Sequence, residues 1–123
     1  MNYTSIEQSK KLLELGLNPD TADMYWSTTL NTPVPYLATK LEHQMYKEGA
    51  NLIPCWSVGA LLEIMPEKIL AHFLVLEKSG NAYQIYYAET LYTYQLAEFE
   101  GNNLIDVVYK MVIWLLKNDY IEK

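Results

Sequence analysis

The hydrophobic positions of this chain follow a helical period near both ends and an alternating, strand-like period between them. In the segment 4–15 the apolar residues fall on one side of a helix, and Thr4 and Glu7 have the spacing of a capping box. Gly16 fits the left-handed position that follows a helix, and Pro19 then ends the run. The pattern predicts a first helix whose two ends are both encoded locally.

The segment 53–66, IPCWSVGALLEIMP, carries the signals of a second, shorter helix. Ser57 has the residue type and position of an N-cap, and Trp56 and Leu61 then occupy the two positions of a hydrophobic staple. Pro66 stops the helix after about two turns. Capping therefore explains most of the residues that make this segment conspicuous.

Three stretches have strand character. Residues 24–30 are rich in aromatic and β-branched types. In 69–76 both alternating faces are apolar, which predicts a central strand covered on both sides. The tetrapeptide 78–81, KSGN, predicts a hairpin turn with Gly80 and Asn81 at its tip, and 91–100 predicts a further strand.

The segment 31–52 has the least regular pattern. Its prolines require an extended or turning backbone at the start. Leu37, Leu41 and Met45 are spaced four residues apart, which suits one face of a helix. We predict a loop in which this part could form a helix.

The last element, 104–117, is predicted to be a helix that is apolar around most of its circumference. Asn103 is its expected cap, and its polar residues Asp106, Lys110 and Lys117 form one narrow stripe. Asp106 and Lys110 have the spacing of an i, i+4 ion pair. A helix of this kind is expected to lie between a sheet and another helical layer.

These elements predict the α+β class: an antiparallel sheet of three or four strands with helices packed on both faces, in α/β/α layers. The length of 123 residues predicts a single domain over 1–123, and half of the residues are hydrophobic, as in globular proteins.

The charge balance bears on the choice of partner. The formal net charge is −6, and all nine basic residues are lysine. Without arginine an acidic chain is a poor candidate for binding nucleic acid. Between Ser79 and Tyr109 there is no lysine, whereas Glu98 and Glu100 fall there, so a charged partner of this region is expected to be basic.

Cysteine usage and hydropathy bear on location and cofactors. One cysteine excludes an internal disulfide and a cysteine-based zinc site. No leader and no apolar run of membrane-spanning length is found, so we expect a cytoplasmic protein that does not enter the membrane. No phosphate loop, dinucleotide fingerprint or zinc spacing is present, and we predict no cofactor and no metal.

Two sets of residues are candidates for a site. Cys55 with His72, or with the other histidine, His43, would be needed for cysteine catalysis, although the spacing matches no cysteine-hydrolase signature and a packed small hydrophobe is favoured. Five of the eleven tyrosines fall between 83 and 94. They predict either core positions or a contact surface, which would comprise Tyr83, Tyr87, Tyr92, Tyr94, Glu98 and Glu100.

Three segments, 5–26, 53–66 and 108–121, resemble small proteins carried by phages and mobile elements of gut bacteria, and the later two thirds of the chain is similar to the phage ABA-sandwich domain. Family members commonly open the last helix with proline or another residue suited to that position and follow it with glycine, and Leu104 and Asp119 stand there in this chain. The resemblance implies an α/β/α layered fold and a phage context, and it implies no activity.

We therefore expect a non-enzymatic phage or mobile-element accessory protein that works by protein–protein contact, with a homodimer as one form of that contact. The alternatives are a small cysteine-dependent hydrolase that uses Cys55 with a histidine, and a ligand-binding module that uses the aromatic surface from Tyr83 to Tyr94.

Overall fold

The computed structural model describes residues 2–29, 34–89 and 95–122, and it confirms the α+β class. Within these ranges the helices are α1 (Ile6–Glu14), the 3₁₀ turn η1 (Pro19–Thr21), α2 (Lys40–Lys47), α3 (Val58–Ile64) and α4 (Leu104–Lys117). The strands are β1 (Met24–Ser27), β2 (Tyr36–Leu37), β3 (Leu52–Cys55), β4 (Lys68–Ile69), β5 (His72–Ser79), β6 (Ala82–Ala88) and β7 (Gln95–Gly101).

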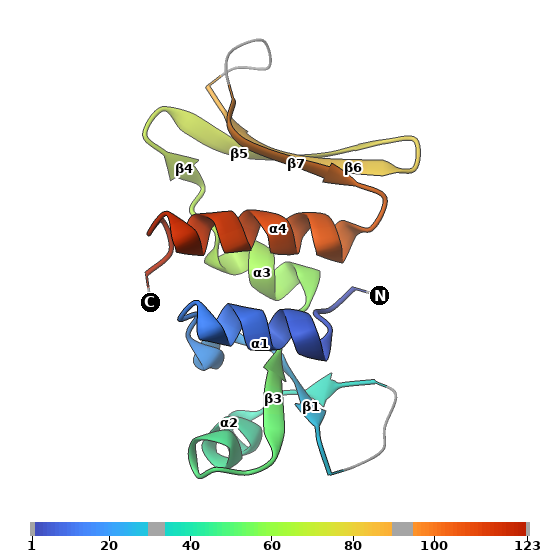
Figure 1. Cartoon of the computed structure of the whole chain (residues 1–123), viewed down its shortest axis with the longest axis vertical. Coiled ribbons are helices and arrows are strands. Elements are labelled where there is room, and N and C mark those ends of the chain that lie inside the picture. Colours follow the sequence, from blue (N-terminus) through green and yellow to red (C-terminus); the bar gives the residue numbers. More distant parts are fainter. Residues whose placement is uncertain (1, 30–33, 90–94, 123) are drawn as a thin grey trace.

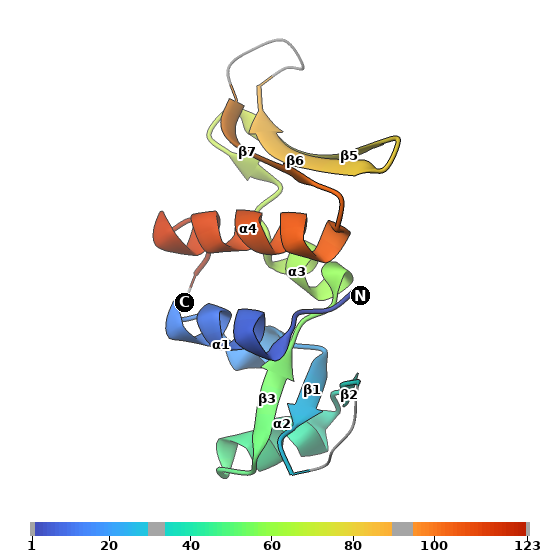
Figure 2. The ribbon, with the colours of Figure 1, turned by 45° about the vertical axis from the view of Figure 1, so that its right-hand side comes forward.

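The strands form two antiparallel sheets, with the order β4-β5-β6-β7 in one and β2-β1-β3 in the other. Figures 1 and 2 show the four-stranded sheet at one end of an elongated molecule, α4, α3 and α1 in the middle, and the small sheet with α2 at the other end. The sequence predicted helices on both faces of one sheet, whereas the main helical layer lies between two sheets. The second sheet takes two of its strands from 31–55, where the periodicity is weakest.

Helix α4 spans 104–117, as predicted, and packs against β6 and β7 on one side and against α3 on the other. Seven of its residues are buried, which confirms its expected place between a sheet and a helical layer. Asn103 is at the cap position but makes no side-chain cap hydrogen bond. Asp106 Oδ1 accepts a hydrogen bond from Gln8 Nε2 of α1 at 2.8 Å, in place of the predicted pair with Lys110.

The prediction of one strand over 69–76, covered on both faces, is wrong. Strand β4 ends at Ile69 and β5 begins at His72, so Leu70 lies in a tight turn, where its φ is 54° and it is 79% exposed. One face of β5 lies on the side of α4, and the other presents Phe73, which is 47% exposed. The apolar residues on the two sides of this segment therefore lie in different environments. One side faces the core, and the other is an exposed apolar face. The KSGN turn is confirmed, with Gly80 at a φ of 59°.

The region 34–52 contains the predicted helix as α2, which begins after a capping box of Thr39 and Glu42. The apolar residues that suggested the helix are not buried, however. Leu37 is 72% exposed and Leu41 65% exposed, so the stripe faces solvent in this structure.

The N-terminus of α1 differs from its predicted form by one residue. Ser5 is the N-cap, and it forms the capping box with Gln8. Gly16 has the predicted left-handed conformation after the helix, with a φ of 95°. Thr4 is therefore not the cap of α1, and its side chain is fully buried.

Thr4 instead joins the N-terminal segment to β1, β3 and α1. Its amide donates to Trp56 O at 2.9 Å, and its Oγ1 accepts from the Trp56 amide at 3.0 Å. Its Oγ1 also shares a hydrogen bond with Ser9 Oγ at 2.8 Å, and its carbonyl accepts from Trp26 Nε1 at 3.1 Å. Because buried polar groups are costly when unpaired, these bonds determine one arrangement of the four segments.

We predict that Thr4→Val lowers the free energy of unfolding by about 2–3 kcal/mol, because it leaves the Trp56 amide and the Ser9 hydroxyl without their buried partner. Denaturant unfolding followed by far-UV circular dichroism measures the change. Thr4→Ser, which keeps the oxygen, is the matched control and should cost about 1 kcal/mol. Equal losses for the two variants would contradict the prediction.

A second prediction concerns the turn at Leu70. We expect Leu70→Asn to raise the free energy of unfolding by about 1 kcal/mol, because a left-handed leucine is strained and asparagine tolerates this conformation. Leu41→Asn, at an exposed leucine inside α2, is the matched control and should give no gain. Denaturant midpoints of the two variants decide the question, and a loss of stability in Leu70→Asn would refute the strain argument.

Candidate functional site

Cys55, the candidate nucleophile, ends strand β3 and is fully buried. Its thiol donates to Thr4 O at 3.3 Å, and its Sγ lies 3.6 Å from Thr4 Oγ1. Burial raises the pKa of Cys55 to about 11, above its ordinary value of 9.0. Because the thiolate is the reactive form, this environment suppresses the chemistry that a cysteine hydrolase requires.

The histidines lie elsewhere in the fold. His72 begins β5, in the sheet on the far side of the helical layer from β3, and its Nδ1 is buried without a hydrogen-bond partner within the described ranges. His43 is on α2, where its Nδ1 bonds Tyr25 OH at 2.7 Å. The structure thus shows no hydrogen bond between Cys55 and either histidine among the residues it describes.

Ser57 is the predicted N-cap of α3, and its Oγ accepts from the Ala60 amide at 3.1 Å. Asp23 accepts from both the amide and the hydroxyl of Ser57. Trp56 and Leu61, the predicted staple residues, are both fully buried in the same core. A surface pocket of about 430 Å³ lies beside Ser57, with no histidine among its lining residues. The hydroxyl therefore caps α3 and bonds the Asp23 carboxylate, and no histidine among the described residues accompanies them in the pocket lining.

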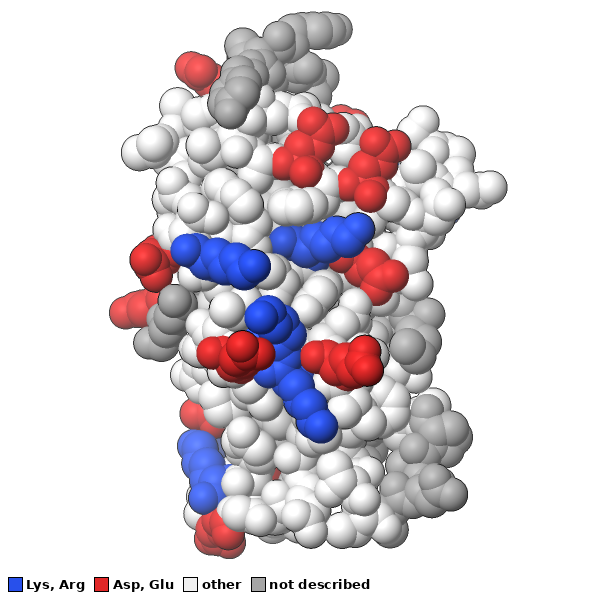
Figure 3. Space-filling view, viewed as in Figure 1, with Lys and Arg blue, Asp and Glu red and all other residues white. Residues whose placement is uncertain are grey.

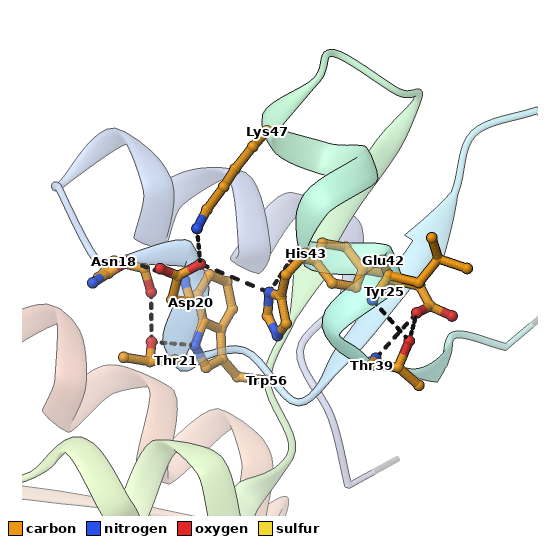
Figure 4. Close-up of polar contacts among 10 residues, drawn as sticks. Asn18, Asp20, Thr21, Tyr25, Thr39, Glu42, His43, Lys47 and Trp56 are labelled. Atoms are coloured by element: carbon orange, nitrogen blue, oxygen red, sulfur yellow. Dashed lines mark hydrogen bonds and ion pairs between the residues drawn. The ribbon is translucent and has the colours of Figure 1, made fainter.

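A second polar cluster links η1, β1 and α2 (Figure 4). Asp20 Oδ1 lies 3.3 Å from Lys47 Nζ and 3.9 Å from His43 Nδ1. Desolvation, followed by the negative charge of Asp20, raises the pKa of Tyr25 to about 12. The phenol therefore stays protonated, and its hydrogen bond with His43 and the ion pair of Asp20 with Lys47 make this cluster a cross-link between elements.

The structure separates the residues of the predicted contact surface. Tyr87 is fully buried on the sheet face that packs on α4, and its hydroxyl donates to Pro66 O at 2.6 Å. Tyr83 shares that face and is partly buried. Glu98 and Glu100 are exposed on the opposite face. Tyr92 and Tyr94 lie outside the described residues.

The face that carries these glutamates is the one turned away from α4. Residues paired across an antiparallel sheet point to the same side, so the register places Val75, Tyr86 and Glu98 together, and Glu77, Gln84 and Glu100 beside them. Figures 1 and 2 show no described helix over this side. We call it the open sheet face, which consists of Phe73, Val75, Glu77, Gln84, Tyr86, Glu98 and Glu100. Its exposed members are Phe73 and the three glutamates, whereas Tyr86 is buried among its neighbours.

Side-chain contacts organise the open sheet face. Tyr86 OH donates to Glu77 Oε1 at 2.7 Å, and this hydrogen bond, together with desolvation, raises the pKa of Tyr86 to about 12. Gln84 donates to Glu98. At one end Lys68 Nζ lies 5.3 Å from the centre of the Phe73 ring. The result is an apolar strip beside three carboxylates.

The sequence contained a signal for the two faces of β6 that the prediction did not use. Counting forward from the KSGN turn, Gln84 and Tyr86 share one face of β6, whereas Ile85 and Tyr87 share the other. Alternation thus separates Tyr86 from Tyr87, but it does not predict exposure, because Tyr86 is only 3% exposed.

The described residues form neither a metal site nor a membrane-spanning helix. Over residues 2–29, 34–89 and 95–122, no group of three His, Cys, Asp or Glu side chains is placed to hold a metal ion. In the same ranges none of the helices combines the length and apolar character that crossing a bilayer requires.

Comparisons with known proteins give no relative to extend these observations. No protein-family model matches the chain, no curated protein matches it, and no solved structure matches it.

The environment of Cys55 leads to a prediction about its reactivity. In the native protein at neutral pH we expect a thiol reagent to modify Cys55 no faster than the protein unfolds, because the thiol is buried and its pKa is raised. Absorbance of the released leaving group measures the rate, and the chain in denaturant, where modification should be complete within minutes, is the control. Rapid reaction of the folded protein would restore the hydrolase hypothesis.

Proposed function

We propose that this protein works by binding another protein, and that the open sheet face is its contact surface. The observation that carries the proposal is Phe73, which is 47% exposed on a sheet face that also holds three carboxylates. Leu70, 79% exposed in the strained turn before β5, is a second exposed apolar side chain within three residues of Phe73 in the chain. A strained backbone that presents a large apolar side chain to solvent is more easily explained by a contact than by the stability of the fold.

The charge of the open sheet face favours a basic partner. Glu77, Glu98 and Glu100 are exposed, and Lys68 at one end is the basic residue beside them. An apolar centre with charged groups around it is the usual composition of a protein interface, and complementary charge directs the choice of partner. A basic protein surface with an apolar side chain at its centre would fit this arrangement.

The two alternative functions receive less support. A hydrolase would need Cys55 as a thiolate near a base, and the thiol is buried with a raised pKa. A ligand-binding module would need the tyrosine rings from Tyr83 to Tyr94 on one surface. Of the three that the structure describes, Tyr86 and Tyr87 are buried and Tyr83 is partly buried, so they do not line an open surface.

The phage or mobile-element context and the cytoplasmic location remain part of this proposal. The first depends on the resemblance of three segments, for which the comparisons supply no further support. The second depends on the lone cysteine and the hydropathy pattern. A homodimer would be one form of the proposed contact, and light scattering of the purified protein would detect it.

The proposal predicts that binding depends on the open sheet face. The immobilised protein is used to capture partners from a bacterial lysate, which mass spectrometry identifies, and titration calorimetry then measures affinity for the purified partner. The triple variant Glu77→Gln/Glu98→Gln/Glu100→Gln should weaken binding about tenfold, and Phe73→Ser should weaken it by a similar factor. The affinity of the wild-type protein should fall as salt is added.

Matched controls carry the same chemical changes elsewhere. Glu7→Gln/Glu63→Gln/Glu122→Gln removes three exposed carboxylates away from the open sheet face, and Leu41→Ser removes an exposed leucine at the far end of the molecule. Both should bind as the wild type does. If every captured protein binds the open-face variants and the controls equally well, the proposal is overturned.

A further inference from the structure

A groove with a positive rim runs between α1, α4 and β7, on a different surface from the open sheet face. It has a volume of about 300 Å³ and is lined by Lys11, Phe99, Tyr109, Lys110, Ile113, Trp114 and Lys117. Figure 3 shows basic side chains across the middle of the molecule, over α1 and α4, with acidic side chains beside them. Three of the nine lysines of a chain with a net charge of −6 therefore lie around one groove.

Two of these lysines are left without an internal counter-charge. Within the described part of the chain, neither Lys110 nor Lys117 has a carboxylate within ion-pair distance, and Lys11 lies 3.6 Å from Glu14. The expected partner of Lys110 was Asp106, whose Oδ1 is instead bound by Gln8 Nε2. The tertiary contact between α1 and α4 therefore leaves the ammonium of Lys110 available.

The floor of the groove is apolar and largely aromatic. The Trp114 ring stacks on Tyr120, with ring centres 5.4 Å apart and planes at 20°, which restricts the indole to one orientation. Phe99 contributes from β7, and because side chains alternate along a strand, the neighbouring Glu98 and Glu100 point to the other face of the sheet. The groove thus combines a flat apolar floor with a cationic rim.

We propose that this groove binds a small organic anion with a flat apolar body, such as an aryl carboxylate or aryl sulfonate. The rings of Phe99, Tyr109 and Trp114 would contact the apolar body, and Lys110 and Lys117 would bind the anionic group. The volume lies at the lower end of the roughly 300–1,000 Å³ that small-molecule sites usually have, which favours a small ligand. This inference is independent of the proposed protein contact.

The test uses two fluorescent probes that differ in charge. Anilinonaphthalene sulfonate has an aromatic body and one negative charge, and phenylnaphthylamine is its neutral analogue. Fluorescence titration of the native protein should show binding of the sulfonate about tenfold tighter than that of the neutral probe. The protein must be folded in each titration, as checked by near-UV circular dichroism, because loosely packed states also bind the sulfonate.

The variant Lys110→Gln/Lys117→Gln should weaken binding of the sulfonate about tenfold and leave the neutral probe unchanged. Lys40→Gln/Lys47→Gln makes the same charge change on α2, and it should leave both probes unaffected. Both lysine pairs are exposed, so the fold is expected to tolerate either change.

Several outcomes would overturn the inference. They are no binding of the sulfonate, equal affinity for the two probes, and equal weakening by the two lysine pairs. Displacement of the sulfonate by a polyglutamate peptide, at a concentration where benzoate does not displace it, would assign the groove to an acidic protein partner instead. The capture experiment on the open sheet face does not depend on any of these results.

Discussion

The buried hydrogen bonds of Thr4 are the constraint on which the remaining structure depends. They hold the chain before α1 against β3 through Trp56, and they hold β1 through the Trp26 indole. Trp56 is fully buried, and its indole Nε1 donates to Thr21 Oγ1 at 2.9 Å, so η1 is joined to the same centre. Because α3 begins directly after Trp56, this network also determines where α3 meets α1 and α4.

The same network decides what the conspicuous polar residues do. Cys55 bonds Thr4, and Ser57 bonds Asp23 and the first turn of α3, so both side chains serve the junction between the N-terminal half and the helical layer. A side chain whose donors and acceptors are already hydrogen-bonded inside the fold is poorly placed to bind or activate a substrate. The two surfaces that we propose for binding lie away from Thr4: the open sheet face, which is acidic and partly apolar, and the groove beside α4, which is lined by lysines and aromatic rings.

Local signals in the sequence predicted the individual elements well. The cap and staple of α3 came from Trp56, Ser57 and Leu61, and α4 was recognised from its continuous apolar surface, because each depends on residues within a few positions of one another. The cap of α1 was misplaced by one residue. Two adjacent hydroxyls, Thr4 and Ser5, can both cap, and only the burial of Thr4 between β1 and β3 selects between them.

By itself the sequence determined the α+β class, the hairpin at Gly80, the two-turn helix after Ser57 and the length of α4, since propensity, capping and periodicity are properties of neighbouring residues. Only the tertiary structure decided that the strands divide into two sheets, that Glu98 lies on the open sheet face while Tyr87 is buried against α4, and that Asp106 binds Gln8 and leaves Lys110 available. The physical reason is the same in each case. Burial, register and ion pairing depend on partners far away in the chain, and local pattern contains no information about which distant segment will supply them.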